Sequence, residues 1–211
     1  MIAKTKEELS ALREGGKRLA RHLEELSALV IPGVIPRNLE KKARELVAID
    51  GDELAFFGYK SGKNDHPYPS GLCISVNDTI VHSPASENGV LIQEGDVVCL
   101  DFGIKHKGLY TDHAVTVIAG KGSAEDMRLL EGTQEALMVG IAEARVGNTT
   151  GHIGEAVERI AKKYGFGFPR NLSGHGVGTK VHEDPHVPNF GRAGEGTPLV
   201  EGLVIAIEPM M

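Results

Sequence analysis

The stretch LDFGIKHKGLYTD, residues 100–112, predicts a β-hairpin that carries two acids. Apolar residues lead into it from Val97, a Lys-His-Lys-Gly segment at 105–108 interrupts the pattern, and LYTDHAVTVI resumes it at residue 109. Two strand-like runs joined by a short polar segment indicate a hairpin. A turn centred between His106 and Lys107 places Asp101 opposite Asp112, with the two side chains on one face about 5 Å apart.

Two carboxylates so close predict a bound cation. At an effective dielectric constant near 20 they repel each other by roughly 3 kcal/mol. Lys105 is a poor counter-ion for Asp101, because four strand residues place it about 13 Å along the strand. The alternative is a G1 bulge at Gly108, which would shift the register and put the carboxylates on opposite faces.

Composition indicates an ordinary globular protein. The chain has 211 residues, 41% of them hydrophobic, and a net charge of -6. A net negative charge does not favour binding to nucleic acid or to an anionic membrane. Apolar runs stay shorter than the roughly 20 residues that span a bilayer, and MIAKTKEELS opens a charged helix where a signal peptide would be apolar. We therefore expect a cytoplasmic protein.

Helices and strands are expected in a repeating order. Thr5 and Glu8 form a capping box, and leucines at helical spacing then continue to about Val30. A second helix carries Leu39, Ala43, Leu46 and Val47 on one face and ends near Gly51. Strands are expected at 72–82 and in the hairpin at 97–118, and further helices at about 124–145 and 150–164.

The two halves of the chain resemble each other. Residues 33–51 align without gaps on 147–165, with glycine on glycine at both ends, and residues 94–102 align on 201–209, which places Asp101 over Glu208. The dipeptide Val-His at 81–82 recurs at 181–182. The pattern predicts an α+β fold with a pseudo-twofold repeat, in which each half gives two helices and antiparallel strands to one site.

Four residues are candidate metal ligands. Asp101, Asp112 and Glu208 lie in or beside apolar strands, and His175 lies in SGHGVG, where glycines are expected to let a ligand approach the backbone. Carboxylates with one imidazole suit Mn, Fe, Co or Zn, and a carboxylate-rich cluster can hold two such ions and activate water. The site is therefore predicted to be hydrolytic.

Each candidate also has a plain structural interpretation. A single Asp at a strand end is more often a turn or cap residue. The pairing of the two aspartates, and the acid at the aligned position Glu208, argue against that interpretation. GHGVG lacks the full spacing of a phosphate-binding loop. The remaining histidines are interpreted as structural: His22, His66, His106, His113, His152 and His186.

Three segments together resemble the type I methionine aminopeptidases, which have the pita-bread (creatinase/aminopeptidase-like) fold. They are LDFGIKHKGLYTDHAVTV, SGHGVGTKVHEDPHV and IAIEPM, in this order. The resemblance covers nearly the whole chain and implies one catalytic domain over 1–211, with repeats at about 1–118 and 119–211. The second repeat is expected to be incomplete at its C-terminal end.

The resemblance also implies a role for each site residue. Asp101, Asp112, His175 and Glu208 would bind one or two divalent ions, with Asp112 bridging them and Glu208 acting as general base. His82 and His182 would contact substrate and stabilise the tetrahedral intermediate. Tyr68 and Cys73 would line the pocket for the methionine side chain.

The chain departs from the family pattern in two respects. The family has a fifth ligand, a second bridging glutamate, beyond the EPM motif, whereas this sequence ends at Met211. A site without it is expected to bind a second metal weakly, and the strand at 203–207 is expected to have an exposed edge. Aromatic pocket positions of the family fall on Asp65 and Val181.

We therefore predict a metal-dependent aminopeptidase that removes the initiator methionine from nascent polypeptides. Its expected partners are N-terminal methionyl peptides and, transiently, the ribosome. Nucleic acid and membrane are not expected as partners, and the protein is expected to be a monomer. Two alternatives stay open. One is an Xaa-Pro peptidase of the same fold, and the other is a non-catalytic protein that uses this fold to bind peptide or the ribosome.

Overall fold

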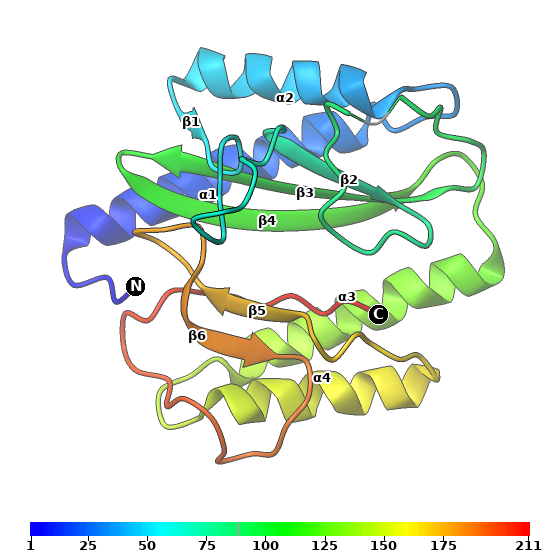
Figure 1. The fold of residues 1–211 in the computed structure, drawn as a ribbon. Helices are drawn as coiled ribbons and strands as arrows, with labels where there is room; N and C mark the ends of the chain where they lie inside the picture. Colours follow the sequence, from blue (N-terminus) through cyan, green and yellow to red (C-terminus); the bar gives the residue numbers. More distant parts are fainter. Residues whose placement is uncertain (88) are drawn as a thin grey trace. The chain divides into compact units, whose positions relative to one another are not determined.

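The computed structural model describes residues 1–87 and 89–211, which divide into two compact units. The first, called here the 6–123 unit, comprises Lys6–Ser123. The second, the 124–211 unit, comprises Ala124–Met211 together with Met1–Thr5. Each unit combines two helices with an antiparallel sheet, so the predicted α+β class is confirmed (Figure 1). The division into one catalytic domain with two repeats stays a prediction.

The 6–123 unit contains two helices and a four-stranded sheet. Its helices are α1 (Lys6–Ser27) and α2 (Pro36–Asp50). Strand β3 lies centrally and pairs antiparallel with its three neighbours. The strands are β1 (Glu53–Leu54), β2 (Leu72–Val76), β3 (Val97–His106) and β4 (Leu109–Ile118).

The β3–β4 hairpin is confirmed, but the predicted pairing of the two aspartates is wrong. The turn consists of Lys107 and Gly108, both at positive φ (50° and 84°), which is the two-residue hairpin geometry that matches strand twist. Asp101 therefore lies opposite Ala114, and Asp112 lies opposite Gly103. Because the register moves by two residues, the aspartates keep the same face as diagonal neighbours. No shift of register interrupts this ladder of described residues, so the bulge alternative is excluded.

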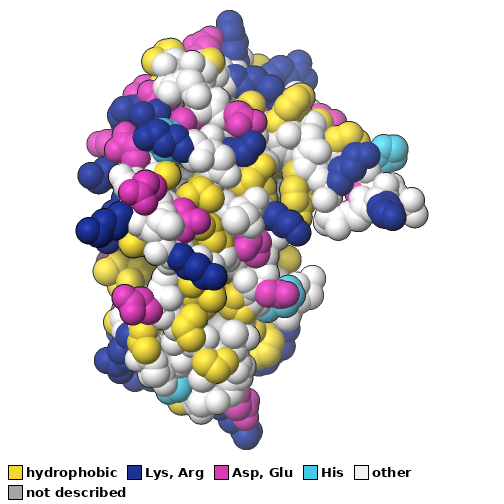
Figure 2. Space-filling view, turned by 90° about the vertical axis from the view of Figure 1, so that its left-hand side faces the viewer, with side chains coloured by type: hydrophobic (Ala, Val, Ile, Leu, Met, Phe, Trp, Pro, Cys, Tyr) yellow, Lys and Arg dark blue, Asp and Glu magenta, His cyan; other side chains and the backbone are white. Residues whose placement is uncertain are grey.

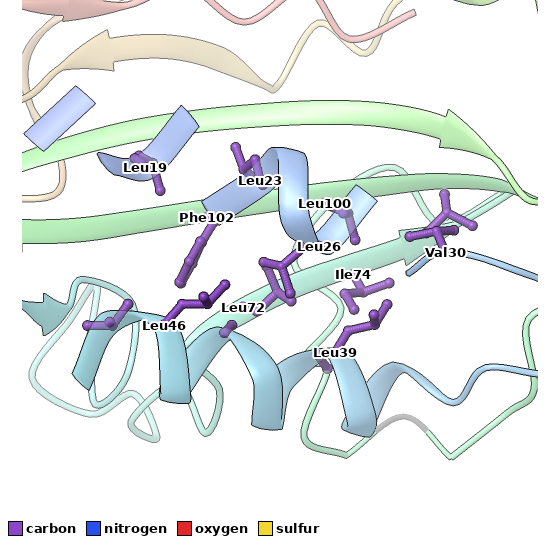
Figure 3. Packing of buried hydrophobic residues seen from close by; sticks show 14 of the residues in the cluster. Leu19, Leu23, Leu26, Val30, Leu39, Leu46, Leu72, Ile74, Leu100 and Phe102 are labelled. Carbon is purple, nitrogen blue, oxygen red and sulfur yellow. The ribbon is translucent and has the colours of Figure 1, made fainter. Parts of the chain in front are cut away.

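Alternation along β3 places the core on one face of this sheet. Val98, Leu100, Phe102 and Ile104 are fully buried and pack with leucines of α1 and α2. Figure 3 shows Leu19, Leu23 and Leu26 of α1 and Leu39 and Leu46 of α2 around Leu72, Ile74, Leu100 and Phe102. Since side chains alternate along a strand, Asp101 points to the face away from these helices.

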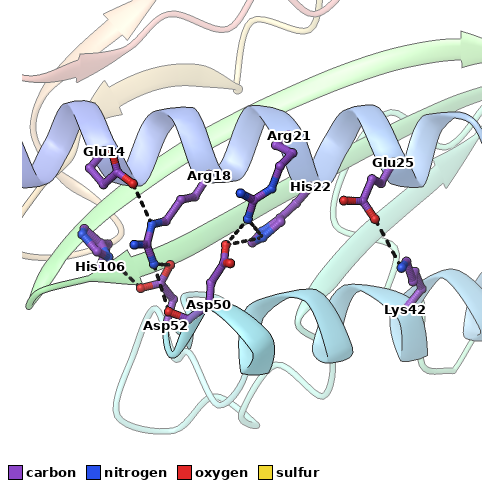
Figure 4. A network of polar contacts seen from close by, with 9 residues as sticks. All are labelled: Glu14, Arg18, Arg21, His22, Glu25, Lys42, Asp50, Asp52 and His106. Atoms are coloured by element: carbon purple, nitrogen blue, oxygen red, sulfur yellow. Dashed lines mark hydrogen bonds and ion pairs between the residues drawn. The ribbon is translucent and has the colours of Figure 1, made fainter.

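A polar network joins α1 to the end of α2 and to β3 (Figure 4). His22 Nε2 lies 2.9 Å from Asp50 Oδ2, which also pairs with Arg21. His106 Nδ1 lies 2.7 Å from Asp52 Oδ1, and Arg18 contacts the same carboxylate. His22 and His106 are thus held by acids within the unit, in agreement with their structural interpretation.

The 124–211 unit has helices α3 (Ala124–Glu143) and α4 (Thr150–Tyr164) and a three-stranded antiparallel sheet. The strand order is β6–β5–β7, with β5 at Ser173–Gly176, β6 at Glu183–Pro188 and β7 at Ile205–Ala206. Ile205 and Ile207 belong to a hydrophobic cluster that includes Ile153 and Val157 of α4. Ala206 and Glu208 alternate with them and therefore belong to the opposite face.

Corresponding segments of the two units have the same local structure. Helices α2 and α4 both span 15 residues and occupy aligned positions, as the gapless sequence match predicts. Each ends on a left-handed glycine, Gly51 and Gly165, which is a common way to stop a helix. The remaining expected elements are confirmed within a few residues, except that the strand expected at 72–82 ends at Val76. The short strands β1, β5 and β6 were not predicted.

None of the helices in the described ranges combines the length and the apolar character that a membrane crossing needs.

Candidate active site

Asp101 and Asp112 project from the sheet face of the 6–123 unit that the helices leave uncovered. Asp101 pairs with Cys73 on β2 and with Ala114 on β4, so these three residues form one cross-strand row. Both aspartates are half-buried. The sheet thus presents two partly desolvated carboxylates beside a small side chain and a thiol.

Cys73 and Tyr68 lie next to this acidic pair. Burial raises the pKa of the Cys73 thiol and the charge of Asp101 raises it further, while Tyr68, Ser75 and the backbone of His82 oppose the rise. Burial likewise raises the pKa of the Tyr68 phenol, and Cys73 and Asp101 add to it. Both groups are therefore neutral at ordinary pH. The two predicted pocket residues are brought together beside a predicted ligand.

Protein fills the space above Gly103, which lies on the same sheet face as the two aspartates. A side chain at Gly103 would meet Ala55 Cβ and the Phe56 ring at 2.8 Å. Gly103 is opposite Asp112, so Ala55 and Phe56 pack close to that position.

His82 has a backbone conformation that non-glycine residues rarely adopt. Its φ is 65°, and its side chain is exposed. Such left-handed residues cost free energy and cluster at functional sites. The residues after it are tied to β2, since Ile74 N–H donates to Ser83 O (2.9 Å) and Cys73 bridges to Pro84. The predicted substrate histidine therefore projects from a constrained turn beside Cys73.

In the 124–211 unit, His175 and Glu208 converge. His175 Nδ1 lies 2.9 Å from the Gly176 carbonyl oxygen, which only accepts, so Nδ1 carries the proton. The other ring nitrogen, Nε2, faces Glu208, whose Oε1 lies 3.1 Å away. Glu208 Oε1 is buried and accepts no hydrogen bond from any described residue. An imidazole nitrogen and a carboxylate oxygen therefore face each other at close range.

This arrangement fits a divalent metal ion. With metal–ligand distances of about 2.1 Å, two neighbouring ligand atoms lie about 3 Å apart. A ligating histidine commonly donates its other N–H to a backbone carbonyl, as His175 does. His175 and Glu208 thus have the donor chemistry and spacing of a ligand pair. No group of three or more His, Cys, Asp or Glu side chains within 1–87 and 89–211 is arranged as a metal site.

His182 lies beside His175, with ring centroids 4.3 Å apart in an edge-on arrangement. Glu183 fixes the turn that carries His182, because its Oε1 accepts hydrogen bonds from Thr179 Oγ1 and Lys180 N, both at 2.7 Å. Its Oε2 pairs with the Met1 ammonium at 2.7 Å. Burial alone would raise the pKa of Glu183, but these hydrogen bonds outweigh it and lower the pKa to about 2.

The glycines around His175 allow close packing of backbone against backbone. The expectation that they let a ligand approach is therefore wrong. A side chain at Gly174 would collide with the carbonyl oxygen of Ala206, and one at Gly176 would collide with that of Asp184. The pairing of β5 with β6 also shifts register between His175 and Gly176, and such bulges often re-aim a side chain beside an active site.

Asn189 is a site residue that sequence reasoning missed. It is 2% exposed, follows β6, and donates its side-chain amide to the Glu208 carbonyl oxygen at 2.7 Å. Its position in VPNF gives no chemical signal, since an asparagine after a proline usually indicates a turn.

Comparisons with known proteins agree with this site chemistry. Residues 10–211 match the model of metallopeptidase family M24. A methionine aminopeptidase of Aquifex aeolicus is 45% identical over 206 residues, covering 97% of this chain and 80% of that protein. The crystal structure of methionine aminopeptidase from Thermotoga maritima superposes with a TM-score of 0.91 at 34% identity, covering 99% of this chain and 82% of that one. The prolidase of Pyrococcus horikoshii shares the fold, with a TM-score of 0.81 at 24% identity, covering 99% of this chain and 55% of that one.

The chain belongs to metallopeptidase family M24. Methionine aminopeptidases of that family match nearly the whole of this chain at 34–45% identity. The predicted pita-bread fold is confirmed by these likenesses.

Proposed function

We propose that this chain is a metal-dependent aminopeptidase that removes the N-terminal methionine from new polypeptides. Its resemblance to methionine aminopeptidases over nearly its whole length supports this activity. The observation that carries the metal chemistry is the convergence of His175 Nε2 and Glu208 Oε1 at 3.1 Å, with Nδ1 already committed to a backbone carbonyl.

Asp101, Asp112, His175 and Glu208 are proposed to hold one or two divalent ions, for which Co, Mn, Fe and Zn are the candidates. When bound, such an ion polarises the scissile carbonyl group and acidifies a water molecule. Glu208 accepts the proton of the attacking water as general base and passes it to the leaving amine.

His82 and His182 are proposed to orient the scissile amide and to donate hydrogen bonds as negative charge develops on its oxygen. Donors of this kind contribute to catalysis because they are aimed in advance at the developing charge. The left-handed conformation at His82 and the hydrogen bonds of Glu183 beside His182 constrain the backbone that carries these two side chains.

Tyr68 and Cys73 are proposed to receive the methionine side chain. Both are neutral, and Cys73 is buried, which suits an unbranched thioether. Their position beside Asp101 brings the first residue of a bound peptide close to a proposed ligand.

The cellular setting is also a proposal. We place the protein in the cytoplasm as a monomer that meets nascent chains, with transient ribosome contact. Basic and acidic side chains are interspersed on the face drawn in Figure 2, which provides no single-sign field for nucleic acid.

The test compares hydrolysis of Met-Ala-Ser and Ala-Pro by this chain while Mn²⁺ or Co²⁺ is titrated. Metal-dependent release of methionine from Met-Ala-Ser alone supports the proposal. Cleavage of Ala-Pro would favour an Xaa-Pro peptidase. Binding of Met-Ala-Ser in calorimetry without hydrolysis at any metal concentration would favour a non-catalytic peptide-binding protein.

A further inference from the structure

Glu40 is a buried acid in the 6–123 unit that the proposed chemistry does not use. It lies on α2, one residue after the core residue Leu39, and is 3% exposed. A carboxylate in such a position is costly unless hydrogen bonds compensate its desolvation. Its partners therefore indicate what it is for.

Among the described residues, three of the four that donate hydrogen bonds to Glu40 are consecutive in the sequence. Ser70 Oγ (2.9 Å) and Leu72 N (2.8 Å) donate to Oε2, and Gly71 N (2.8 Å) donates to Oε1. The fourth is Arg44 Nε, 2.6 Å from Oε1, at the edge of the unit. The carboxylate thus accepts hydrogen bonds from each of residues 70–72, which connect Tyr68 to Cys73.

The same contacts extend to the segment that follows His82. Ser86 N donates to Ser70 Oγ at 3.1 Å, and Ser86 Oγ donates to Pro69 O at 3.2 Å. Ala85 N also donates to Leu72 O at 3.2 Å. Glu40 therefore anchors one layer of backbone that carries Tyr68 and Cys73 and, through Ser70, the end of the His82 turn.

The aligned position in the other unit shows that such a helix does not need an acid to pack on its sheet. Glu40 aligns with Gly154 of α4, where an added side chain would collide with the Phe190 carbonyl oxygen. In the 124–211 unit the helix thus contacts backbone directly. In the 6–123 unit the Glu40 carboxylate occupies the corresponding place and accepts hydrogen bonds from the backbone N–H groups of Gly71 and Leu72.

We infer that Glu40 is a positioning residue that sets Tyr68, Cys73 and His82 in place to bind the N-terminal residue of the substrate. This inference rests on the proposed function, because it takes those three residues as the substrate-binding group. Glu40 acts through the 70–72 backbone and touches no substrate itself.

The test is Glu40→Gln, which keeps the shape but has a single acceptor oxygen. Whichever way the amide lies, its NH₂ group meets a backbone N–H, from Gly71 on one side or Leu72 on the other. We expect KM for Met-Ala-Ser to rise about 10- to 100-fold, since a displacement near 1 Å costs about that much. As KM rises, the preference for methionine over leucine at the first position should decrease. The affinity for Mn²⁺ should stay unchanged.

Two further variants control this experiment. Glu45→Gln changes an exposed acid on the same helix and should leave KM and side-chain preference unchanged. Ser70→Ala removes the hydrogen bonds that join Ser70 Oγ to Glu40 and to Ser86 but keeps both backbone hydrogen bonds to Glu40. A smaller rise in KM is therefore expected, and it can be measured even if Glu40→Gln does not fold. Unchanged KM and unchanged preference in a folded Glu40→Gln, or in Ser70→Ala, overturn the inference.

Binding of free L-methionine in calorimetry separates this inference from the proposed function. If the wild-type chain binds methionine without hydrolysing peptides, the aminopeptidase proposal fails. A loss of that binding in Glu40→Gln still supports the positioning role, and retained binding overturns it. A wild-type chain that neither binds methionine nor hydrolyses Met-Ala-Ser overturns both.

Discussion

The side-chain amide of Asn189 holds the main chain of Glu208, donating to its carbonyl oxygen at 2.7 Å. Asn189 follows β6, and Glu208 follows β7, so this contact joins the two segments on either side of His175. Asn189 is buried, and a buried amide needs hydrogen-bond partners, so this bond holds both residues in place.

Asn189→Asp should lower kcat by about tenfold or more, because a carboxylate in place of the amide faces a carbonyl oxygen and displaces the Glu208 backbone. Steady-state kinetics on Met-Ala-Ser at saturating Mn²⁺ measure the effect. Asn171→Asp, at an exposed position, is the matched control. A variant as active as the wild-type chain would show that this hydrogen bond has no part in placing Glu208.

Asp112→Asn should weaken Mn²⁺ binding by at least about 100-fold, since even partners one step removed from a metal cost 10- to 100-fold. The amide is a poor ligand but nearly the same shape, so circular dichroism and melting temperature should change little. Calorimetric titration with Mn²⁺ gives the affinity directly, without depending on turnover. Asp78→Asn, at an exposed position, serves as the control, and wild-type affinity in Asp112→Asn would remove Asp112 from the ligand set.

His182→Ala should lower kcat about 100- to 1,000-fold, which is the usual effect of losing one donor to a developing oxyanion. Mn²⁺ affinity should stay close to that of the wild-type chain, because His182 is assigned to substrate and not to metal. His66→Ala changes an exposed histidine elsewhere and should leave both quantities unaltered. A parallel loss of metal affinity and kcat would instead identify His182 as a ligand.

The free energy of unfolding should depend on Glu183 in acid. Its pKa is about 2 in the folded chain against an ordinary value of 4.5, so its stabilisation is complete above pH 4.5 and is lost as pH falls toward 2. The total is about 3 kcal/mol at most, at 1.36 kcal/mol per pKa unit. Urea unfolding at several pH values should show a flatter acid dependence for Glu183→Gln than for the wild type. Glu195→Gln should keep the wild-type slope.

His22 should make the chain less stable as pH falls below about 6.5. Burial lowers the pKa of His22 more than Asp50 raises it, so the unfolded chain binds the proton first. Stability is therefore complete above the unfolded pKa and falls toward the lower folded pKa, by up to about 1.4 kcal/mol per pH unit. His22→Gln keeps a donor for Asp50 and should remove this dependence in urea titrations between pH 7 and 5. An identical slope in both proteins would contradict the assignment.

Local signals were sufficient for the helices, the hairpin and the repeat. The gapless match of 33–51 with 147–165 predicted corresponding helices that end near aligned glycines, because capping and apolar spacing are properties of neighbouring residues. The structure shows both glycines in the left-handed conformation. The motifs around Asp101, His175 and Glu208 also indicated the family. A signal for Glu40 was present as well, since it lies three residues before Ala43 and seven before Val47 on the buried face of its helix.

Sequence patterns were enough for the helices, for the β3–β4 hairpin with both aspartates on one sheet face, and for the family. The tertiary fold was needed to show that Asp101 lies opposite Ala114, that Glu40 binds the backbone of residues 70–72, and that Asn189 contacts Glu208. The range of the interactions explains this difference. Propensity and alternation act between neighbours in the chain, whereas register, burial and hydrogen-bond partners depend on which distant segments meet and on the turn that aligns them.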